Sequence, residues 1–332
     1  QYMAQNIMVG TVDGDIYYVR NGRVPVRPAG CDPSKPMPGT GECEWQGIHP
    51  FEDLPQVENP PQGYMQNCNI SPWVMMKDSP LTPERFAAHP YLYNAARTPA
   101  HQRAAMVLDL LAAAQEVTAA QALGIAFSTE VYKADLWQDR IRKAGADDEF
   151  ARVILDWNRH SDAGSRGALA YYLFKTSLGE RSKLIEPPDD LSDDDVRAAL
   201  RGAERQLKSD FQPGAVYGTL FRVGREGSAR NWPVGGGTLA SAGMATPRAI
   251  GFDKKGDIML GRSGQTSTQV VILTKPPQSW MVIPLGESDH ADSPHFDDQA
   301  EKLFSQARAK PTYFLRRDEV DKHATAVKEL TY

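Results

Sequence analysis

The hydrophobic pattern of this 332-residue chain changes twice, and this change constrains the fold more than any other feature. Residues 6–19 (NIMVGTVDGDIYYV) hold two β-rich runs on either side of Asp13-Gly14, a pair typical of a hairpin turn. Residues 101–208 contain segments with helical spacing, and strand-like runs return from Gly214 onward. Strands, then helices, then further strands predict an α+β fold, in which a sheet carries a helical insertion.

We therefore expect three parts along the chain. Residues 1–75 form a hairpin and a long loop, residues 76–210 a mainly helical insertion, and residues 211–332 a return to the sheet with C-terminal helices. Thr118 and Ser192 are predicted helix caps. The predicted helices are 101–117, 118–126, 131–144, 148–159, 166–178, 193–208, 297–308 and 318–328, and the predicted strands after the insertion are 215–223, 248–252, 257–261, 268–274 and 279–286.

Charge and hydropathy exclude two classes of partner. The chain carries 37 basic and 42 acidic residues, a net charge of −5, and shows no basic stripe. Nucleic acid is therefore not an expected partner. No run approaches the roughly 18–20 apolar residues of a membrane span, so no span is expected either.

A Pro- and Gly-rich loop occupies residues 21–62, and ordered loops of such length usually carry function. It contains Cys31 and Cys43, which are 12 residues apart, while Cys68 follows the loop. The spacing permits one disulfide bridge, which needs an oxidising compartment, and equally permits three free thiols.

Several motifs have a plain structural interpretation. Gly235-Gly236-Gly237-Thr238 lacks the Lys of a phosphate-binding loop, and Gly261-Arg262-Ser263-Gly264 does not match a nucleophile elbow. The acidic residues 189–195 suit the start of a helix. His290, Asp292, His295 and Asp297 have metal-ligand chemistry, but Pro294 interrupts them, so we expect a surface loop there. A metallohydrolase would require a bound transition metal at these residues.

Asn67 and Asn69, which follow the long loop in GYMQNCN, are the remaining candidates. On an extended segment their side chains share a face. An Asn amide donates hydrogen bonds without ionising, which suits the oxyanion of an acyl-transfer intermediate. The alternative is turn formation or backbone capping.

Residues 36–73 resemble the β-chain of penicillin acylases and of the related acyl-homoserine-lactone and aculeacin acylases. The resemblance includes the hairpin at 6–19 and resumes in PHFDDQ (294–299) and in FLRRDEVDKH near the end, with the helical middle matching more loosely. Its motifs are Pro38-Gly39-Thr40-Gly41, Trp45-x-Gly47, Pro50-Phe51 and Gly63-Tyr64-x-x-Asn67-x-Asn69.

The resemblance implies an N-terminal nucleophile hydrolase with an αββα sandwich, in which a Ser exposed by autoproteolysis attacks an amide and its α-amine acts as base. It assigns the oxyanion-hole amide to Asn69 and an active-site supporting role to Arg103, whose alternative is a helix-start ion pair. Asn67 and Cys68 would position Asn69 or contact substrate. No cofactor is expected for catalysis, but the carbonyl of Pro33 matches a ligand of a structural calcium, with Asp78 as a guess for its companion.

The resemblance also implies what this chain lacks. Gln1 has neither hydroxyl nor thiol, so we expect the chain to be the C-terminal part of a β-chain, inactive alone, with its nucleophile upstream. Its expected partners are the upstream β-chain segment, the α-chain of the same precursor and a small acylated amide. We expect a periplasmic or extracellular location. The alternative is a non-catalytic or degenerate acylase-like binding domain.

Overall fold

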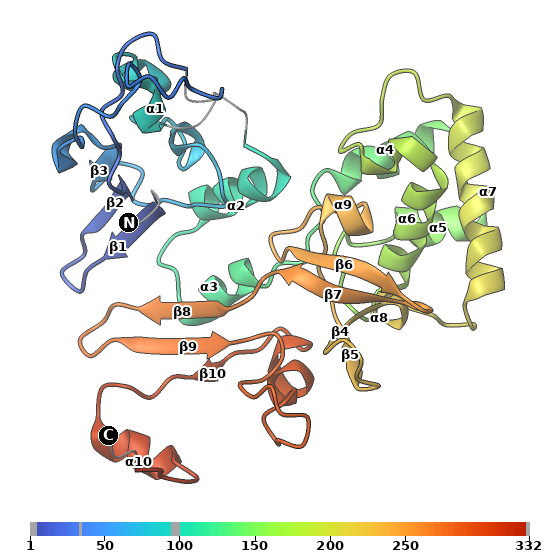
Figure 1. The fold of residues 1–332 in the computed structure, drawn as a ribbon. Coiled ribbons are helices and arrows are strands. Elements are labelled where there is room, and N and C mark those ends of the chain that lie inside the picture. The colour runs from blue at the N-terminus through green and yellow to red at the C-terminus, as the bar shows by residue number, and fades with distance from the viewer. Residues whose placement is uncertain (1–4, 33–34, 94–99, 330–332) are drawn as a thin grey trace. The chain divides into compact units, whose positions relative to one another are not determined.

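The structure is a computed structural model that describes residues 5–32, 35–93 and 100–329. It divides into two compact units, Gln1–Ala114 and Gln115–Tyr332 (Figure 1). Each unit is built from both helices and strands. The three-part division at residues 75 and 210 stays a prediction.

The first unit contains the predicted hairpin. Strands β1 (Gln5–Gly10) and β2 (Ile16–Asn21) pair antiparallel, and β3 (Gln56–Glu58) adds to the other side of β2. The connection contains Gly14, whose φ of +101° lies in the region that glycine adopts without steric cost. The hairpin prediction from Asp13-Gly14 is therefore confirmed.

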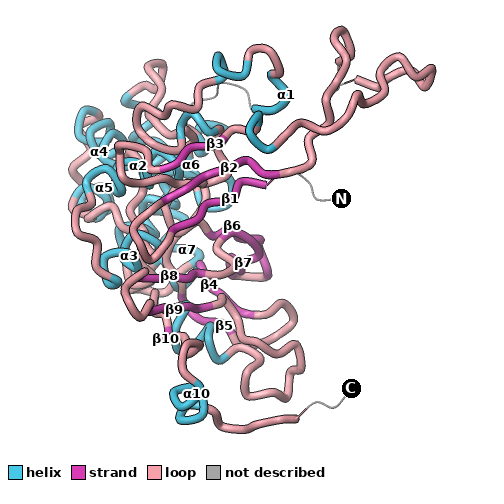
Figure 2. Tube along the Cα trace, turned by 90° about the vertical axis from the view of Figure 1, so that its left-hand side faces the viewer, coloured by secondary structure: helices cyan, strands magenta, loops and turns pink. Residues whose placement is uncertain are grey.

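The rest of this unit is largely loop, drawn in pink in Figure 2. Cys31 and Cys43 form a disulfide with a Cα–Cα distance of 5.8 Å, which confirms the bridge, and Cys68 is a free thiol. Buried His49 fastens the loop through its two ring nitrogens, 2.8 Å from Asp53 Oδ2 and 2.9 Å from the Tyr91 hydroxyl. The short helices are η1 (Phe51–Asp53), η2 (Pro72–Val74), η3 (Pro83–Phe86) and α1 (Pro90–Tyr93), and one longer helix, α2 (Gln102–Ala113), ends the unit.

A small apolar core holds the segment that follows the long loop. Tyr18 from β2 packs with Met75, Met76 and Leu81, all of them at most 1% exposed. The Tyr93 hydroxyl accepts hydrogen bonds from the Ser71 hydroxyl and the Trp73 N–H and donates to the Leu81 carbonyl. Residues 63–75 are thereby fixed on both the sheet side and the α1 side.

The second unit begins with the helices that the sequence predicts. Thr118 and Ser192 cap α3 and α7, each with its side chain accepting from the backbone N–H three residues later, as expected for capping boxes. The acids at 193–195 lie in the first turn of α7, so their interpretation as a helix start is confirmed. The helices are α3 (Ala119–Ala126), α4 (Ala134–Lys143), α5 (Glu149–Leu155), α6 (Arg166–Ser177), η4 (Gly179–Lys183) and α7 (Asp193–Asp210).

Helix α6 is the centre of this unit's core. Lys175 is only 1% exposed, and its ammonium lies 3.5 Å from the centre of the Trp137 ring and donates to the Leu184 carbonyl at 2.7 Å. Burial lowers the pKa of Lys175 to about 7. Gly167 lies against Trp157 so closely that an added Cβ would stand 2.4 Å from the Trp157 Cβ.

The remaining strands form two sheets. One has the order β5 (Asn231–Pro233), β4 (Phe221–Gly224), β7 (Ile258–Gly264), β6 (Ile250–Lys255), with β4 and β7 parallel. The other has the order β10 (Lys310–Pro311), β9 (Gln278–Val282), β8 (Thr268–Ile272) and is antiparallel. Helix α9 (Leu239–Ala242) precedes β6.

Three predicted elements differ from the structure. The predicted strand 215–223 is wrong at residues 217–220, which form the short helix α8 (Tyr217–Leu220). The N–H groups of Tyr217 and Gly218 bond there to carbonyls of the loop before α6. The predicted helix 297–308 is a π-helical turn, Ala300–Phe304. The predicted final helix 318–328 is shorter, since α10 covers Arg317–His323.

In the described part of the chain, no helix has the length and apolar character needed to cross a membrane.

Candidate active site

Asn69, the predicted oxyanion donor, lies in the first unit at an exposed position. Its φ of +62° places it in the left-handed region, which Asn tolerates better than most residues. The Asn67 Oδ1 accepts a hydrogen bond from the Asn69 N–H at 3.2 Å, which closes an Asx-type turn. The two Asn residues therefore do not share one face of an extended segment: the first holds the backbone of the second.

Arg103 fixes the orientation of the Asn69 amide. Its Nη2 lies 2.8 Å from Asn69 Oδ1 and 2.8 Å from the Cys68 carbonyl. Because a guanidinium can only donate, the amide atom that faces Arg103 must be the oxygen. The Nδ2 donor of Asn69 consequently points away from Arg103, and no partner for it is found among the described residues.

His101 adds a second clamp on the same turn. Its Nε2 lies 2.7 Å from the Cys68 carbonyl, which can only accept, so Nε2 carries the proton. The unprotonated Nδ1 then accepts from the Ala104 N–H at 3.4 Å and caps helix α2. The start of one helix thus places His101 and Arg103 on one carbonyl, and sequence reasoning missed the role of His101.

Two further residues tie Asn67 to the sheet. Asn6 of β1 donates from Nδ2 to Asn67 Oδ1 at 3.4 Å, and the Tyr18 hydroxyl donates to Asn6 Oδ1 at 2.8 Å. Burial raises the pKa of Tyr18 to about 12, so its hydroxyl remains a donor at neutral pH. Asn6 and Tyr18 are diagonal neighbours in the hairpin. The register of the two strands would therefore have been enough to predict this contact.

Cys68 is held on its other side by Gln66. The Cys68 N–H donates to the Gln66 Oε1 at 2.9 Å, and the buried Gln66 bonds in turn to the Val74 and Met75 carbonyls. Burial raises the pKa of the Cys68 thiol, with Arg103 lowering it in part. A raised pKa leaves the thiol protonated and so makes Cys68 a poor nucleophile. Its predicted contact with substrate stays a prediction.

The other candidates lie outside this arrangement. Pro33, the expected calcium ligand, lies outside the described residues, and the Asp78 carbonyl accepts from Gln62. Within residues 5–32, 35–93 and 100–329, no three His, Cys, Asp or Glu side chains gather as a metal site would require. Calcium binding therefore stays a prediction. Residues 290–295 are mostly exposed, as a surface loop predicts, and His295 lies 3.1 Å from Asp298. Asp297 differs from that prediction, because it is buried and pairs with Arg230.

The geometry thus presents an oriented amide donor on a hydrogen-bonded turn. Comparison with known proteins then decides the family, because a model of the penicillin amidase family matches residues 1–320. The chain belongs to the penicillin amidase family. The resemblance inferred from the motifs between residues 36 and 73 is confirmed.

Individual relatives of this penicillin amidase family member match in parts. The chain is 45% identical over 80 residues to penicillin G acylase of Escherichia coli, a match that covers 24% of this chain and 9% of that protein. It is 30% identical over 179 residues to penicillin acylase 2 proenzyme of a Pseudomonas species, covering 52% of this chain and 21% of that protein. The matches thus span about a tenth and a fifth of these relatives' lengths.

A solved structure shows the fold. The chain resembles a thermostable penicillin G acylase from Alcaligenes faecalis with a TM-score of 0.56 and 18% sequence identity, over 100% of this chain and 68% of that one. The fold is therefore that of penicillin acylases, the N-terminal nucleophile hydrolase fold that the resemblance implied, and its mixture of helices and strands agrees with the order of predicted elements.

Proposed function

We propose that this chain is part of an amide hydrolase that acts on small acylated amines, and that it supplies the Asn69 side chain to the oxyanion hole. The observation that carries the proposal is the Arg103–Asn69 contact, since it turns the Asn69 amide so that Nδ2 faces away from the protein network. Family membership supports the reaction class.

In the proposed reaction a nucleophile adds to the amide carbonyl carbon, and the carbonyl oxygen becomes an oxyanion. Asn69 Nδ2 donates to that oxygen, while the C–N bond then breaks and the amine leaves with a proton. Water hydrolyses the acyl-enzyme and releases the carboxylate. A donor that is aimed before the reaction stabilises the developing charge without reorganisation, and one such donor contributes about 2.7–4 kcal/mol.

The nucleophile is proposed to come from outside residues 1–332. The thiol that lies next to Asn69 belongs to Cys68, and its raised pKa argues against it. We accordingly propose partners in an upstream β-chain segment and an α-chain, in keeping with the relative named as a proenzyme. The Cys31–Cys43 disulfide supports a periplasmic or extracellular location.

The test uses the complete enzyme that contains this chain, with Asn69→Asp as the main variant. Aspartate keeps the size of the side chain and its bond to Arg103 but has no N–H to donate, so kcat should fall about 100- to 1,000-fold with KM little changed. The kcat of Asn69→Gly should fall by as much. Because glycine adopts a positive φ without steric cost, a loss in this variant comes from the missing donor and not from backbone strain.

Asn59 provides the matched control, because it is also an Asn with positive φ in the same unit but lies outside the site. Asn59→Ala should lower stability and leave kcat near the wild-type value. If Asn69→Asp retained more than a third of the wild-type kcat, Asn69 would not be the oxyanion donor.

A further inference from the structure

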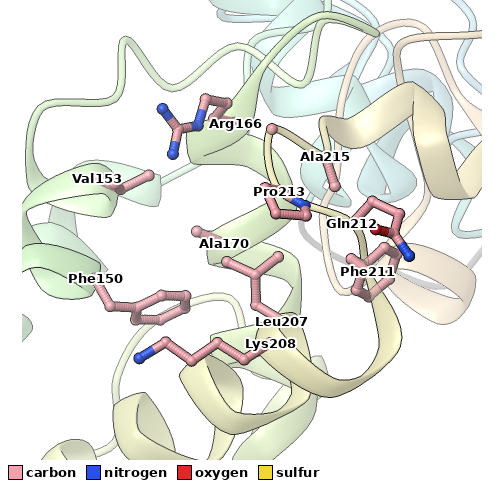
Figure 3. Close-up of a pocket in the computed structure, with 11 residues that line it drawn as sticks. Phe150, Val153, Arg166, Ala170, Leu207, Lys208, Phe211, Gln212, Pro213 and Ala215 are labelled. Carbon is pink, nitrogen blue, oxygen red and sulfur yellow. The ribbon is translucent and has the colours of Figure 1, made fainter.

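We propose that the second unit contains a separate binding site for a small carboxylate with an apolar body, in a cavity between α5, α6 and the end of α7. The cavity has a volume of about 320 Å³ and is drawn in Figure 3. This size lies at the lower end of the range, roughly 300–1,000 Å³, of pockets that hold small molecules. The proposal is independent of the hydrolytic site, which lies in the first unit.

The walls of the cavity are mainly apolar. Phe150 and Val153 come from α5, Ala170 from α6 and Leu207 from α7, while Phe211 belongs to the loop that follows. These side chains suit an alkyl or aryl group, because enclosing such a group removes its apolar surface from water. The turn at Gly214, with a φ of +86°, closes this loop beside the cavity.

The charged side chains at the cavity indicate which polar group the ligand carries. Arg166 lies at one end of the lining side chains and Lys208 at the other, with Ala170 and Leu207 between them (Figure 3). Lys208 is already paired with Glu204 at 2.6 Å, whereas no carboxylate within the described part of the chain pairs with Arg166. Arg166 therefore places a positive charge at the exposed end of the cavity, with no carboxylate partner among the described residues.

The position of Arg166 strengthens this assignment. It is the first residue of α6, a 12-residue helix whose first turn contains no acidic side chain. The positive end of the helix dipole favours negative charge and disfavours a cation there. A carboxylate bonded to Arg166 would relieve that unfavourable arrangement, and a guanidinium binds a carboxylate through two parallel hydrogen bonds.

The experiment measures octanoate binding to the complete enzyme by calorimetry, with octanol and octylamine as uncharged and cationic probes of the same chain length. Arg166→Gln should weaken octanoate binding about tenfold or more and leave octanol unaffected, because it removes only the charged partner. Leu207→Trp should abolish binding of both by filling the cavity. Arg152→Gln, an exposed arginine on α5 outside the lining, is the matched control.

The hydrolytic site is monitored in the same variants. Amide hydrolysis should be unchanged in Arg166→Gln and Leu207→Trp, and octanoate binding should survive Asn69→Asp, so this proposal and the hydrolase proposal fail separately. Octylamine binding as tightly as octanoate, or octanoate affinity unchanged in Arg166→Gln, would overturn the proposed site. The exposed position of Arg166 means that its variant retains the fold even if Leu207→Trp does not.

Discussion

In the proposed function Arg103 is a positioning residue, so its effect on the reaction should depend on Asn69. The planned change is Arg103→Met, which keeps an unbranched apolar stem and removes the Nη2 that lies 2.8 Å from both Asn69 Oδ1 and the Cys68 carbonyl. His101 still holds that carbonyl in the variant, so the turn keeps one of its two clamps. The Asn69 amide, by contrast, loses the group that orients it.

The expected magnitude follows from these contacts. A hydrogen bond to a charged group contributes about 1.5–3 kcal/mol, and the catalytic loss cannot exceed the roughly 2.7–4 kcal/mol of the donor that Arg103 orients. We therefore expect kcat/KM to fall about 10- to 100-fold, which corresponds to about 1.4–2.7 kcal/mol. The loss should appear in kcat, because the proposed role of Asn69 is to stabilise the transition state.

The assay is a double-mutant cycle with Asn69→Ala in the complete enzyme. When Asn69 lacks its amide, Arg103 has nothing to orient, so Arg103→Met should then cost less than about threefold. Arg103→Lys should fall between wild type and Arg103→Met, because it keeps the charge without the planar fork. Additive losses would refute the reasoning and show that Arg103 acts on the substrate or on another group.

Two predictions concern the core of the second unit. Lys175 over the Trp137 ring has a pKa of about 7 when folded against 10.5 as a free side chain, so the unfolded chain binds more protons between these values and stability rises with pH across that window. In urea unfolding, the free energy of unfolding of the wild type relative to Lys175→Met should rise by roughly 2 kcal/mol from pH 7 to pH 9. A difference that does not change with pH would contradict the lowered pKa of Lys175. Gly167→Ala should destabilise because its Cβ would clash with Trp157, whereas Gly124→Ala in α3, with open space, should stabilise by about 0.5–1 kcal/mol. Thermal unfolding compares the two, and a stabilised Gly167→Ala would refute the contact.

Local signals in the sequence predicted local structure well. Asp13-Gly14 located the hairpin, and Thr118 and Ser192 located helix starts, because turns and caps depend on residues within three or four positions. The same reasoning failed at Tyr217–Leu220, where β-favouring residues form a helical turn. Their backbone groups bond to a loop more than fifty residues earlier, and no local pattern reports that contact.

The candidate site shows the same limit. Its donor, Asn69, and its supporting residue, Arg103, came from the family resemblance, but the physical link between them is a contact across 34 residues. His101 was missed because its role depends on reaching the Cys68 carbonyl, 33 residues away. The turn at Asn67 and Asn69 was one of two interpretations left open, because two Asn residues in a loop fit an extended segment as well as a turn, and the structure shows the turn.

The central claim is that Asn69 donates its hydrogen bond to the oxyanion of the tetrahedral intermediate and not to the carbonyl oxygen of the bound amide. The most direct test is the affinity of the complete enzyme for a boronic acid that forms a tetrahedral, negatively charged adduct with the nucleophile, measured beside the affinity for an uncleaved amide. Asn69→Ala should weaken the boronate about 100-fold or more and change amide binding less than about threefold. Equal boronate affinity in wild type and Asn69→Ala would contradict the account.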